Sequence, residues 1–171
     1  SYISDVPSRV VAGLVQEGLL RVDTEGRELP RCDAVIICVQ TPLRKSKEPD
    51  LSTIVAACGA LAKRLRRGHL VILESTTYPG TTEEIVRPAL ESSGLKAGKD
   101  FFLAFSPERV DPGNAKWKIA NTPKVVGGVD AASTRLACAL YASIVRRVVP
   151  VSSATAAELV KLLENSFRAV N

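Results

Sequence analysis

The sequence predicts an α/β fold built around a mainly parallel sheet. Short apolar runs such as Ala34–Val39 and Leu70–Leu73 alternate with longer segments whose apolar residues repeat at helical spacing. The short runs are apolar at every position, which is typical of parallel strands covered on both faces. Because strand and helix alternate along the whole chain, we expect βαβ units with right-handed crossovers.

Five segments are predicted to be helical, and capping or breaking residues delimit them. Asp50 or Ser52 begins the second helix, and Gly68 follows its end. Ser152 or Ser153 caps the last helix, which continues to the end of the chain. In chain order, the helices are expected at residues 6–18, 52–66, 83–93, 131–144 and from 153 onward.

Strands are predicted between these helices. Pro150 removes one main-chain donor from the last strand, so that strand is expected at an edge of the sheet. The first segment, Leu19–Asp23, is expected to be a short strand. In chain order, the strands are expected at residues 19–23, 31–39, 70–73, 101–105, 124–127 and 145–151.

Length and composition indicate one globular domain without a membrane span. The chain has 171 residues, 46% of them hydrophobic, and a net charge of +5. No apolar run is long enough to cross a bilayer, and the basic residues are scattered, so neither a membrane nor a nucleic acid is an expected partner. The four cysteines at 32, 38, 58 and 138 match no zinc spacing. We expect buried free thiols, no metal site and a cytoplasmic location.

Polar residues gather where three of the predicted strands end. Thr41 follows the first clear strand, Thr76 follows the second, and Glu108 and Arg109 follow the third. Ligands bind open α/β sheets at the carboxyl ends of strands, where hydroxyl and main-chain N–H groups suit phosphate and ribose oxygens. For each hydroxyl alone, a role as a helix cap is the better explanation. Together they favour a nucleotide site.

The last helix carries a polar row beside an apolar seam. Lys161 and Asn165 are four residues apart and lie on one face, so both can donate hydrogen bonds to one developing oxyanion. An ordinary solvated helix face explains the same spacing. The seam follows a spacing typical of helix packing and consists of Ala156, Val160, Leu163, Phe167 and Val170.

Five segments in order resemble the UDP-glucose/GDP-mannose dehydrogenase family. They are CDAVIICVQTPL, VILESTTYPGTTEEIVRPALE, FSPERVDPGN, PKVVGG and AELVKLLENSFRAVN. The resemblance covers almost the whole chain. The form of the third segment resembles members that act on UDP-N-acetylhexosamines more than members that act on UDP-glucose.

The resemblance implies a fold and a domain division. Residues 1–152 would form a partial Rossmann-like NAD-binding domain that lacks the first βαβ unit. Residues 153–171 would begin the central helix, through which the family forms homodimers. Members oxidise the C6 alcohol of a UDP-sugar to a carboxylate, with NAD as cofactor and through an enzyme thioester. The implied role is in polysaccharide biosynthesis.

The resemblance also implies roles for individual residues. Thr41 and Thr76 would contact NAD, and Arg109 would contact the substrate. Glu108 would act in acyl transfer or thioester hydrolysis, while Lys161 and Asn165 would stabilise the oxyanion or order the attacking water. Some relatives carry a second glutamate four positions after the first. Here that position is Pro112, next to Asp111.

Two family features are missing from these 171 residues: the G-x-G-x-x-G fingerprint and the motif of the nucleophilic cysteine. We therefore expect an internal piece of a dehydrogenase that is inactive alone. Two alternatives stay open. One is a non-catalytic Rossmann-like module for binding or oligomerisation through the seam. The other is a two-domain dehydrogenase of the 3-hydroxyacid type, against which the Ser-Pro-Glu-Arg segment argues.

Overall fold

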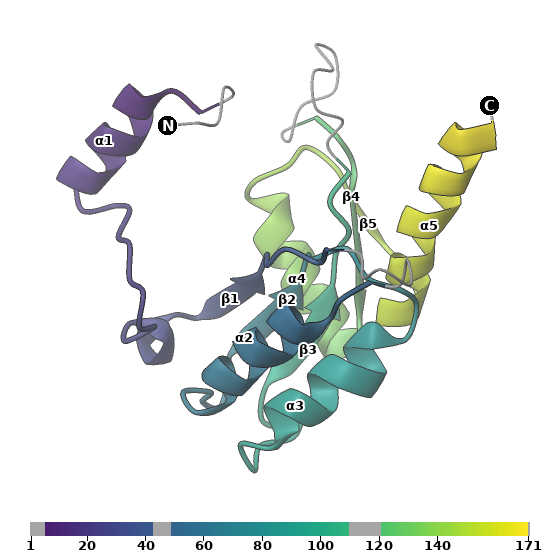
Figure 1. The fold of residues 1–171 in the computed structure, drawn as a ribbon, viewed down its shortest axis with the longest axis horizontal. Coiled ribbons are helices and arrows are strands. Elements are labelled where there is room, and N and C mark those ends of the chain that lie inside the picture. The colour runs from purple at the N-terminus through teal and green to yellow at the C-terminus, as the bar shows by residue number, and fades with distance from the viewer. Residues whose placement is uncertain (1–5, 43–48, 110–120, 171) are drawn as a thin grey trace.

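A computed structural model of the chain describes residues 6–42, 49–109 and 121–170, without the side chains of residues 168 and 169. Its centre is a sheet of five strands in the order β1-β2-β3-β4-β5 (Figure 1). The first three strands are parallel, β4 is antiparallel to β3, and β5 is parallel to β4. The α/β prediction is confirmed. The strands are β1 (Ala34–Ile37), β2 (Leu70–Leu73), β3 (Phe102–Phe105), β4 (Lys124–Gly128) and β5 (Val148–Pro150).

Helices cover both faces of this sheet because alternate strand residues point to opposite sides. Val71 and Leu73 of β2 pack into the larger core, whereas Leu70 and Ile72 pack into the smaller one. The larger core receives helices α2 (Ser52–Ala62), α3 (Arg87–Glu91) and α5 (Ala154–Val170). The smaller core receives α4 (Ala131–Ala142). Strand β2, an interior strand of the sheet, is buried along its whole length.

The N-terminal segment is separate from this three-layer body. Helix α1 (Ser8–Gln16) has no buried residue and stands away from the sheet (Figure 1). The predicted strand at Leu19–Asp23 is wrong, because these residues form no strand. A strand needs a neighbour to pair its main-chain groups, and the described residues place none beside this segment.

The predicted helix at residues 83–93 consists of two parts. A π-helical turn, η2 (Thr82–Val86), precedes α3. Pro88 has no N–H to donate to the carbonyl four residues earlier, and its ring crowds that carbonyl. Arg87 instead donates its N–H to the Thr82 carbonyl, five residues back. The wider turn fits the position of this proline.

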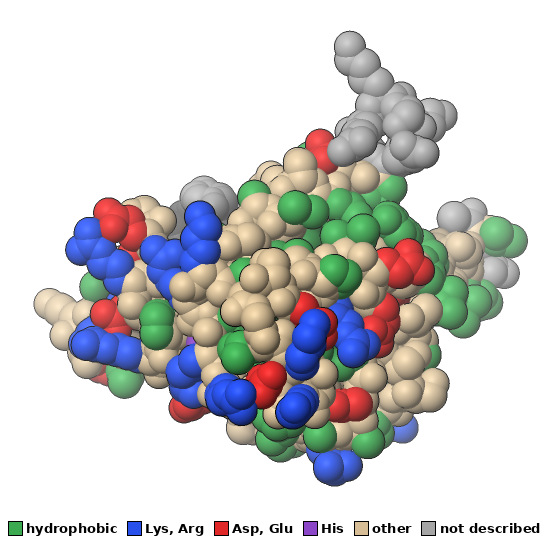
Figure 2. Space-filling model, turned by 90° about the horizontal axis from the view of Figure 1, so that it is seen from below, with side chains coloured by type: hydrophobic (Ala, Val, Ile, Leu, Met, Phe, Trp, Pro, Cys, Tyr) green, Lys and Arg blue, Asp and Glu red, His purple; other side chains and the backbone are tan. Residues whose placement is uncertain are grey.

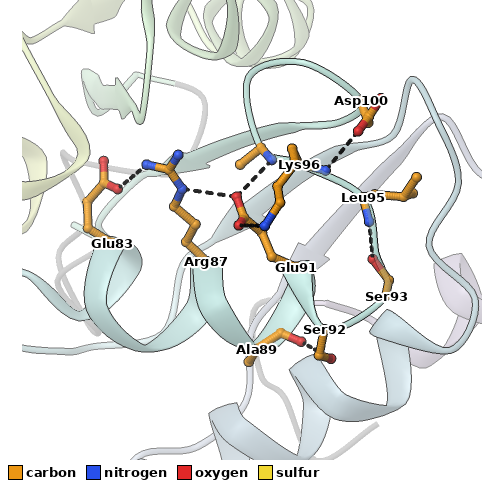
Figure 3. Close-up of polar contacts among 10 residues, drawn as sticks. Glu83, Arg87, Ala89, Glu91, Ser92, Ser93, Leu95, Lys96 and Asp100 are labelled. Atoms are coloured by element: carbon orange, nitrogen blue, oxygen red, sulfur yellow. Dashed lines mark hydrogen bonds and ion pairs between the residues drawn. The ribbon is translucent and has the colours of Figure 1, made fainter.

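Charged side chains of both signs intermix on the face that Figure 2 shows. A mixed cluster surrounds Arg87, whose guanidinium lies 3.0 Å from Glu83 and 3.2 Å from Glu91 (Figure 3). Lys96 lies 2.8 Å from the other Glu91 oxygen, and this ammonium is the main reason that the pKa of Glu91 is lowered. The cluster ties α3 to the loop that leads into β3.

Close main-chain approach positions α5 against β4. A Cβ added at Gly127 would lie 2.0 Å from the Ser153 carbonyl oxygen, so only glycine fits there. The Ser153 hydroxyl then accepts a hydrogen bond from the Ala156 N–H at 3.1 Å, which confirms Ser153 as the cap. Within the described residues, no helix combines the length and the apolar character that crossing a membrane requires.

Candidate functional site

The carboxyl ends of β1 and β2 line an open cavity of about 460 Å³. Glu108, from the segment after β3, also lines it. Three of the residues that the sequence singled out, Thr41, Thr76 and Glu108, lie on its wall. They come from three strand ends that are far apart in the sequence. The other lining residues are Cys38, Val39, Gln40, Pro42, Glu74 and Ser75.

Hydroxyl groups tie the first two strand ends together. The Thr41 hydroxyl donates to the main-chain carbonyl of Thr76 at 2.8 Å. The Ser75 hydroxyl donates to the Val39 carbonyl at 2.7 Å. Each of these two hydroxyls donates to the main chain at the end of the neighbouring strand. Neither bond is the helix cap that was the alternative explanation. They fix the shape of the cavity wall.

The structure brings Glu108 and Lys161 together. The Lys161 ammonium donates a hydrogen bond to the main-chain carbonyl of Glu108. Before Glu108, the buried Ser106 hydroxyl donates to the Val125 carbonyl at 2.7 Å and attaches the end of β3 to β4. The Glu108 side chain itself is half-exposed, at 50%. The site therefore presents a carboxylate at the cavity wall, on a main chain held from two sides.

Asn165 lies one helical turn after Lys161 on α5, and its side chain is exposed. A joint role for these two donors stays a prediction. Asp111 and Pro112, which were also named above, lie outside the residues that the structure describes.

Arg109 contacts protein groups in this structure. Its guanidinium forms a two-pronged ion pair with Glu164 of α5, with Nε 3.0 Å from Oε2. Its Nη1 donates to the Pro123 carbonyl at 2.8 Å. Both charged side chains are mostly buried, at 22% and 26% exposed. Bidentate pairs of this kind hold segments in a defined geometry. The role of Arg109 as a substrate contact stays a prediction.

The sequence analysis missed a buried polar cluster next to Glu108. Lys124 lies 2.9 Å from Glu74 and 3.9 Å from Glu108, and the Tyr141 hydroxyl donates to Glu74. Burial, followed by the hydrogen bond to Glu74, raises the pKa of Tyr141. Lys124 begins a strand, whereas the rule for ligand sites in α/β sheets points to residues that follow strands. Because β4 runs antiparallel to β3, its beginning lies at the same edge of the sheet as the carboxyl end of β3.

A second missed residue is Glu158 on α5, which is fully buried. Its carboxylate accepts hydrogen bonds from the N–H groups of Gly80 and Thr82, at 2.6 and 2.9 Å, and from the Thr82 hydroxyl at 2.6 Å. Burial raises the pKa of Glu158, while these donors oppose that shift. Glu158 thus joins the turn after Thr76 to the helix that carries Lys161.

The cysteine prediction needs correction. Cys58 is buried, but Cys38 is exposed at the cavity wall and Cys32 and Cys138 are half-buried. Cys38 falls at the end of β1, where the strand leaves the core, so its apolar neighbours do not imply burial. Its partial burial and the nearby Glu74 carboxylate raise the pKa of the thiol to about 11. All four cysteines are free.

Comparisons with known proteins point to one group of enzymes. A family model described as the NAD binding domain of the UDP-glucose/GDP-mannose dehydrogenase family matches residues 3–145. The chain is 43% identical over 154 residues to a UDP-N-acetyl-D-mannosamine dehydrogenase of Pyrococcus horikoshii, covering 90% of this chain and 37% of that protein. It is 39% identical over 147 residues to a UDP-N-acetyl-D-glucosamine 6-dehydrogenase of Pseudomonas aeruginosa, covering 85% and 35%.

A solved structure agrees with these sequence matches. The crystal structure of an NDP-N-acetyl-D-galactosaminuronic acid dehydrogenase from Methanosarcina mazei superposes with a TM-score of 0.86 at 40% identity. The superposition covers 94% of this chain and 34% of that one. The chain thus spans little more than a third of the length of these relatives.

Proposed function

The chain belongs to the UDP-glucose/GDP-mannose dehydrogenase family, and on that premise we propose that it is part of an NAD-dependent UDP-sugar 6-dehydrogenase. The whole protein oxidises the C6 alcohol of a UDP-sugar to the carboxylate. A UDP-N-acetylhexosamine is the favoured substrate. The observation that carries this proposal is the convergence of Thr41, Thr76 and Glu108 on one cavity, with Lys161 bonded to the Glu108 main chain.

The residues around the cavity fit part of an NAD molecule. The matched family domain binds NAD, and the cavity of about 460 Å³ opens at the carboxyl ends of parallel strands, where α/β folds bind nucleotides. The hydrogen bond from the Thr41 hydroxyl to the Thr76 main-chain carbonyl holds this wall in place. When bound, NAD supplies the acceptor for the hydride that leaves C6.

The charged groups of the site then take distinct roles. Lys161 and Asn165 donate hydrogen bonds to the oxygen on C6 as negative charge develops there. Glu108 acts in the transfer or hydrolysis of a thioester formed on an enzyme cysteine, by accepting a proton from the attacking water. The ion pair with Glu164 of α5 fixes Arg109 in place in the segment after β3, and Arg109 borders the sugar. Hydrolysis cleaves the C–S bond, restores the thiol and releases the carboxylate.

Two observations support a UDP-N-acetylhexosamine over UDP-glucose. The segment after β3 has the Ser-Pro-Glu-Arg-Val-Asp-Pro-Gly-Asn form. The similar proteins described above are named for N-acetylated sugars. We also propose that the protein forms a homodimer through α5, because this helix exposes an apolar row that includes Leu163, at 71%, and Val170, at 85%.

The test is a coupled assay of the full-length protein with NAD and a panel of nucleotide sugars. We expect NADH from UDP-N-acetylmannosamine or UDP-N-acetylglucosamine at a higher kcat/KM than from UDP-glucose or GDP-mannose. The 171-residue chain, assayed in parallel, is expected to make none. A full-length protein that oxidises no nucleotide sugar would contradict the proposed function.

A further inference from the structure

The charged cluster beside Glu108 is built around a nearly buried ammonium group. The Lys124 side chain is only 12% exposed and lies at the start of β4, between the end of β2 and the segment after β3. Its Nζ atom also lies 5.0 Å from the centre of the Tyr141 ring. A buried ammonium requires opposite charge nearby. Two carboxylates supply it here, and they make unequal contacts.

Glu74 is the fixed partner of Lys124. Its side chain is 15% exposed, and its Oε1 atom lies 2.9 Å from the Lys124 ammonium. The same oxygen accepts a hydrogen bond from the Tyr141 hydroxyl, while Oε2 lies 3.7 Å from the Cys38 thiol. Groups from β1, β2, β4 and α4 thus meet at this carboxylate. Glu74 and Tyr141 therefore set the position of the ammonium.

Glu108 is the more distant carboxylate partner of Lys124. Its Oε2 atom lies 3.9 Å from Lys124, which is within ion-pair range but beyond hydrogen-bond range. Lys124 thus places positive charge beside this carboxylate without holding the oxygen in a hydrogen bond. Lys161 meanwhile holds the main-chain carbonyl of the same residue. Lys124 of β4 thus lies beside the side-chain carboxylate of Glu108, and Lys161 of α5 binds the main-chain carbonyl of Glu108.

We propose that Lys124 is a positioning residue for the reaction: anchored by Glu74 and Tyr141, it orients the Glu108 carboxylate. The inference rests on the proposed function, in which Glu108 accepts a proton. An ammonium 3.9 Å from one carboxylate oxygen attracts that oxygen by direct Coulomb interaction and so favours one orientation of the carboxylate. Lys124 acts through Glu108 and not through contact with the sugar.

The test variant must not leave the Glu74 carboxylate without its ion-pair partner, whereas Lys124 still has the Glu108 carboxylate at 3.9 Å when Glu74 is neutral. Lys124→Met alone would strand the Glu74 carboxylate and destabilise the fold. The informative comparison is therefore Glu74→Gln against the double variant Lys124→Met/Glu74→Gln, in the full-length protein. Both lack the Glu74 charge, and only the second lacks the ammonium. The matched control is Lys96→Met/Glu91→Gln, which makes the same chemical change at an ion pair of 2.8 Å at the far end of α3 (Figure 3).

Relative to Glu74→Gln, the Lys124 double variant should lower kcat by roughly tenfold or more. The KM for NAD and for the sugar should change by less than about threefold, since Lys124 contacts neither in this account. The control pair should stay within about twofold of the unmodified protein. The folded state of each variant is checked by circular dichroism and size-exclusion chromatography.

In a Glu108→Gln background, the intact Lys124–Glu74 pair is then compared with Lys124→Met/Glu74→Gln, so that the ammonium never loses both carboxylates. The readout is slow steady-state NADH formation, which requires thioester hydrolysis in every turnover. If Lys124 acts through Glu108, its removal changes this residual rate by less than about twofold. An equal loss in both backgrounds, or no loss in either, would overturn the inference. Unmodified protein that makes no NADH would instead overturn the proposed function, so the two failures are distinct.

Discussion

The Lys161 ammonium donates a hydrogen bond to the main-chain carbonyl of Glu108, 53 residues earlier in the chain. This bond joins α5 to the segment after β3 and places a cation beside Glu108. Glu158, one turn earlier on the same helix, bonds the turn after β2. Helix α5 therefore organises the site, because it connects the ends of both strands.

The first prediction concerns Lys161. Replacing Lys161 with Met removes a donor to the developing oxyanion and a contact with Glu108, and should lower kcat by about 100- to 1000-fold. Lys63→Met is the control, since Lys63 is exposed at the end of α2 and should leave kcat unchanged. Steady-state NADH formation by the full-length variants measures both. A Lys161 variant with normal kcat would exclude Lys161 from the chemistry.

The second prediction concerns Thr41. Thr41→Val keeps the shape of the side chain and removes the hydrogen bond to the Thr76 carbonyl. One such bond contributes about 1 kcal/mol to stability, so the free energy of unfolding should fall by about that amount. Because the cavity wall loses this tie, the KM for NAD should also rise, by at most roughly fivefold. Thr24→Val, at an exposed position, is the matched control. An unchanged KM for NAD would place the cofactor elsewhere.

The third prediction concerns the ion pair between Arg109 and Glu164. Glu164→Gln should lower the free energy of unfolding by about 1.5–3 kcal/mol, because it weakens two hydrogen bonds to a mostly buried guanidinium. Arg109→Met should cost a similar amount, and the double variant should cost less than the sum of the two. Urea denaturation measures all three. Strictly additive losses would show that the two side chains do not stabilise each other.

The fourth prediction is a pH dependence that originates at Glu158. Burial raises the pKa of this carboxyl above its ordinary value of 4.5 in the folded protein. Folding therefore favours the protonated form of Glu158. The contribution of this carboxyl to the free energy of unfolding is fully present below pH 4.5 and is lost as the pH rises through its pKa in the folded protein. Glu158→Gln cannot titrate. The stability of the natural protein relative to this variant should accordingly fall as the pH increases.

Urea denaturation of both proteins at several pH values measures that difference. If the free energy of unfolding of the natural protein instead rises relative to that of the variant as the pH increases, the three donors to the carboxylate outweigh the effect of its burial. Glu158 would then be stabilising as an anion, contrary to the prediction.

Local signals in the sequence were enough to predict much of the fold. The Leu70–Leu73 strand has the predicted bounds, and Ser153 caps the last helix. Thr41, Thr76 and Glu108 could be placed together because the carboxyl ends of neighbouring parallel strands share one edge. This rule needs only the order of strands and the residues that follow them.

Non-local relationships account for the rest. Lys124 could not be found, because its place at the site depends on the antiparallel direction of β4. The prediction of a strand at Leu19–Asp23 was wrong, because strand formation depends on a neighbouring strand and not on the segment alone. The partner of Arg109 was likewise hidden, since the approach of Glu164 depends on how α5 packs across the sheet.

The most direct measurement of the central claim is the stoichiometry of the full-length reaction with a UDP-N-acetylhexosamine and excess NAD. The proposed oxidation of an alcohol to a carboxylate removes four electrons and therefore forms two NADH for each sugar consumed. Mass spectrometry should identify the product as the UDP-N-acetylhexosaminuronate. One NADH for each sugar with an aldehyde product, or no NADH at all, would contradict the account.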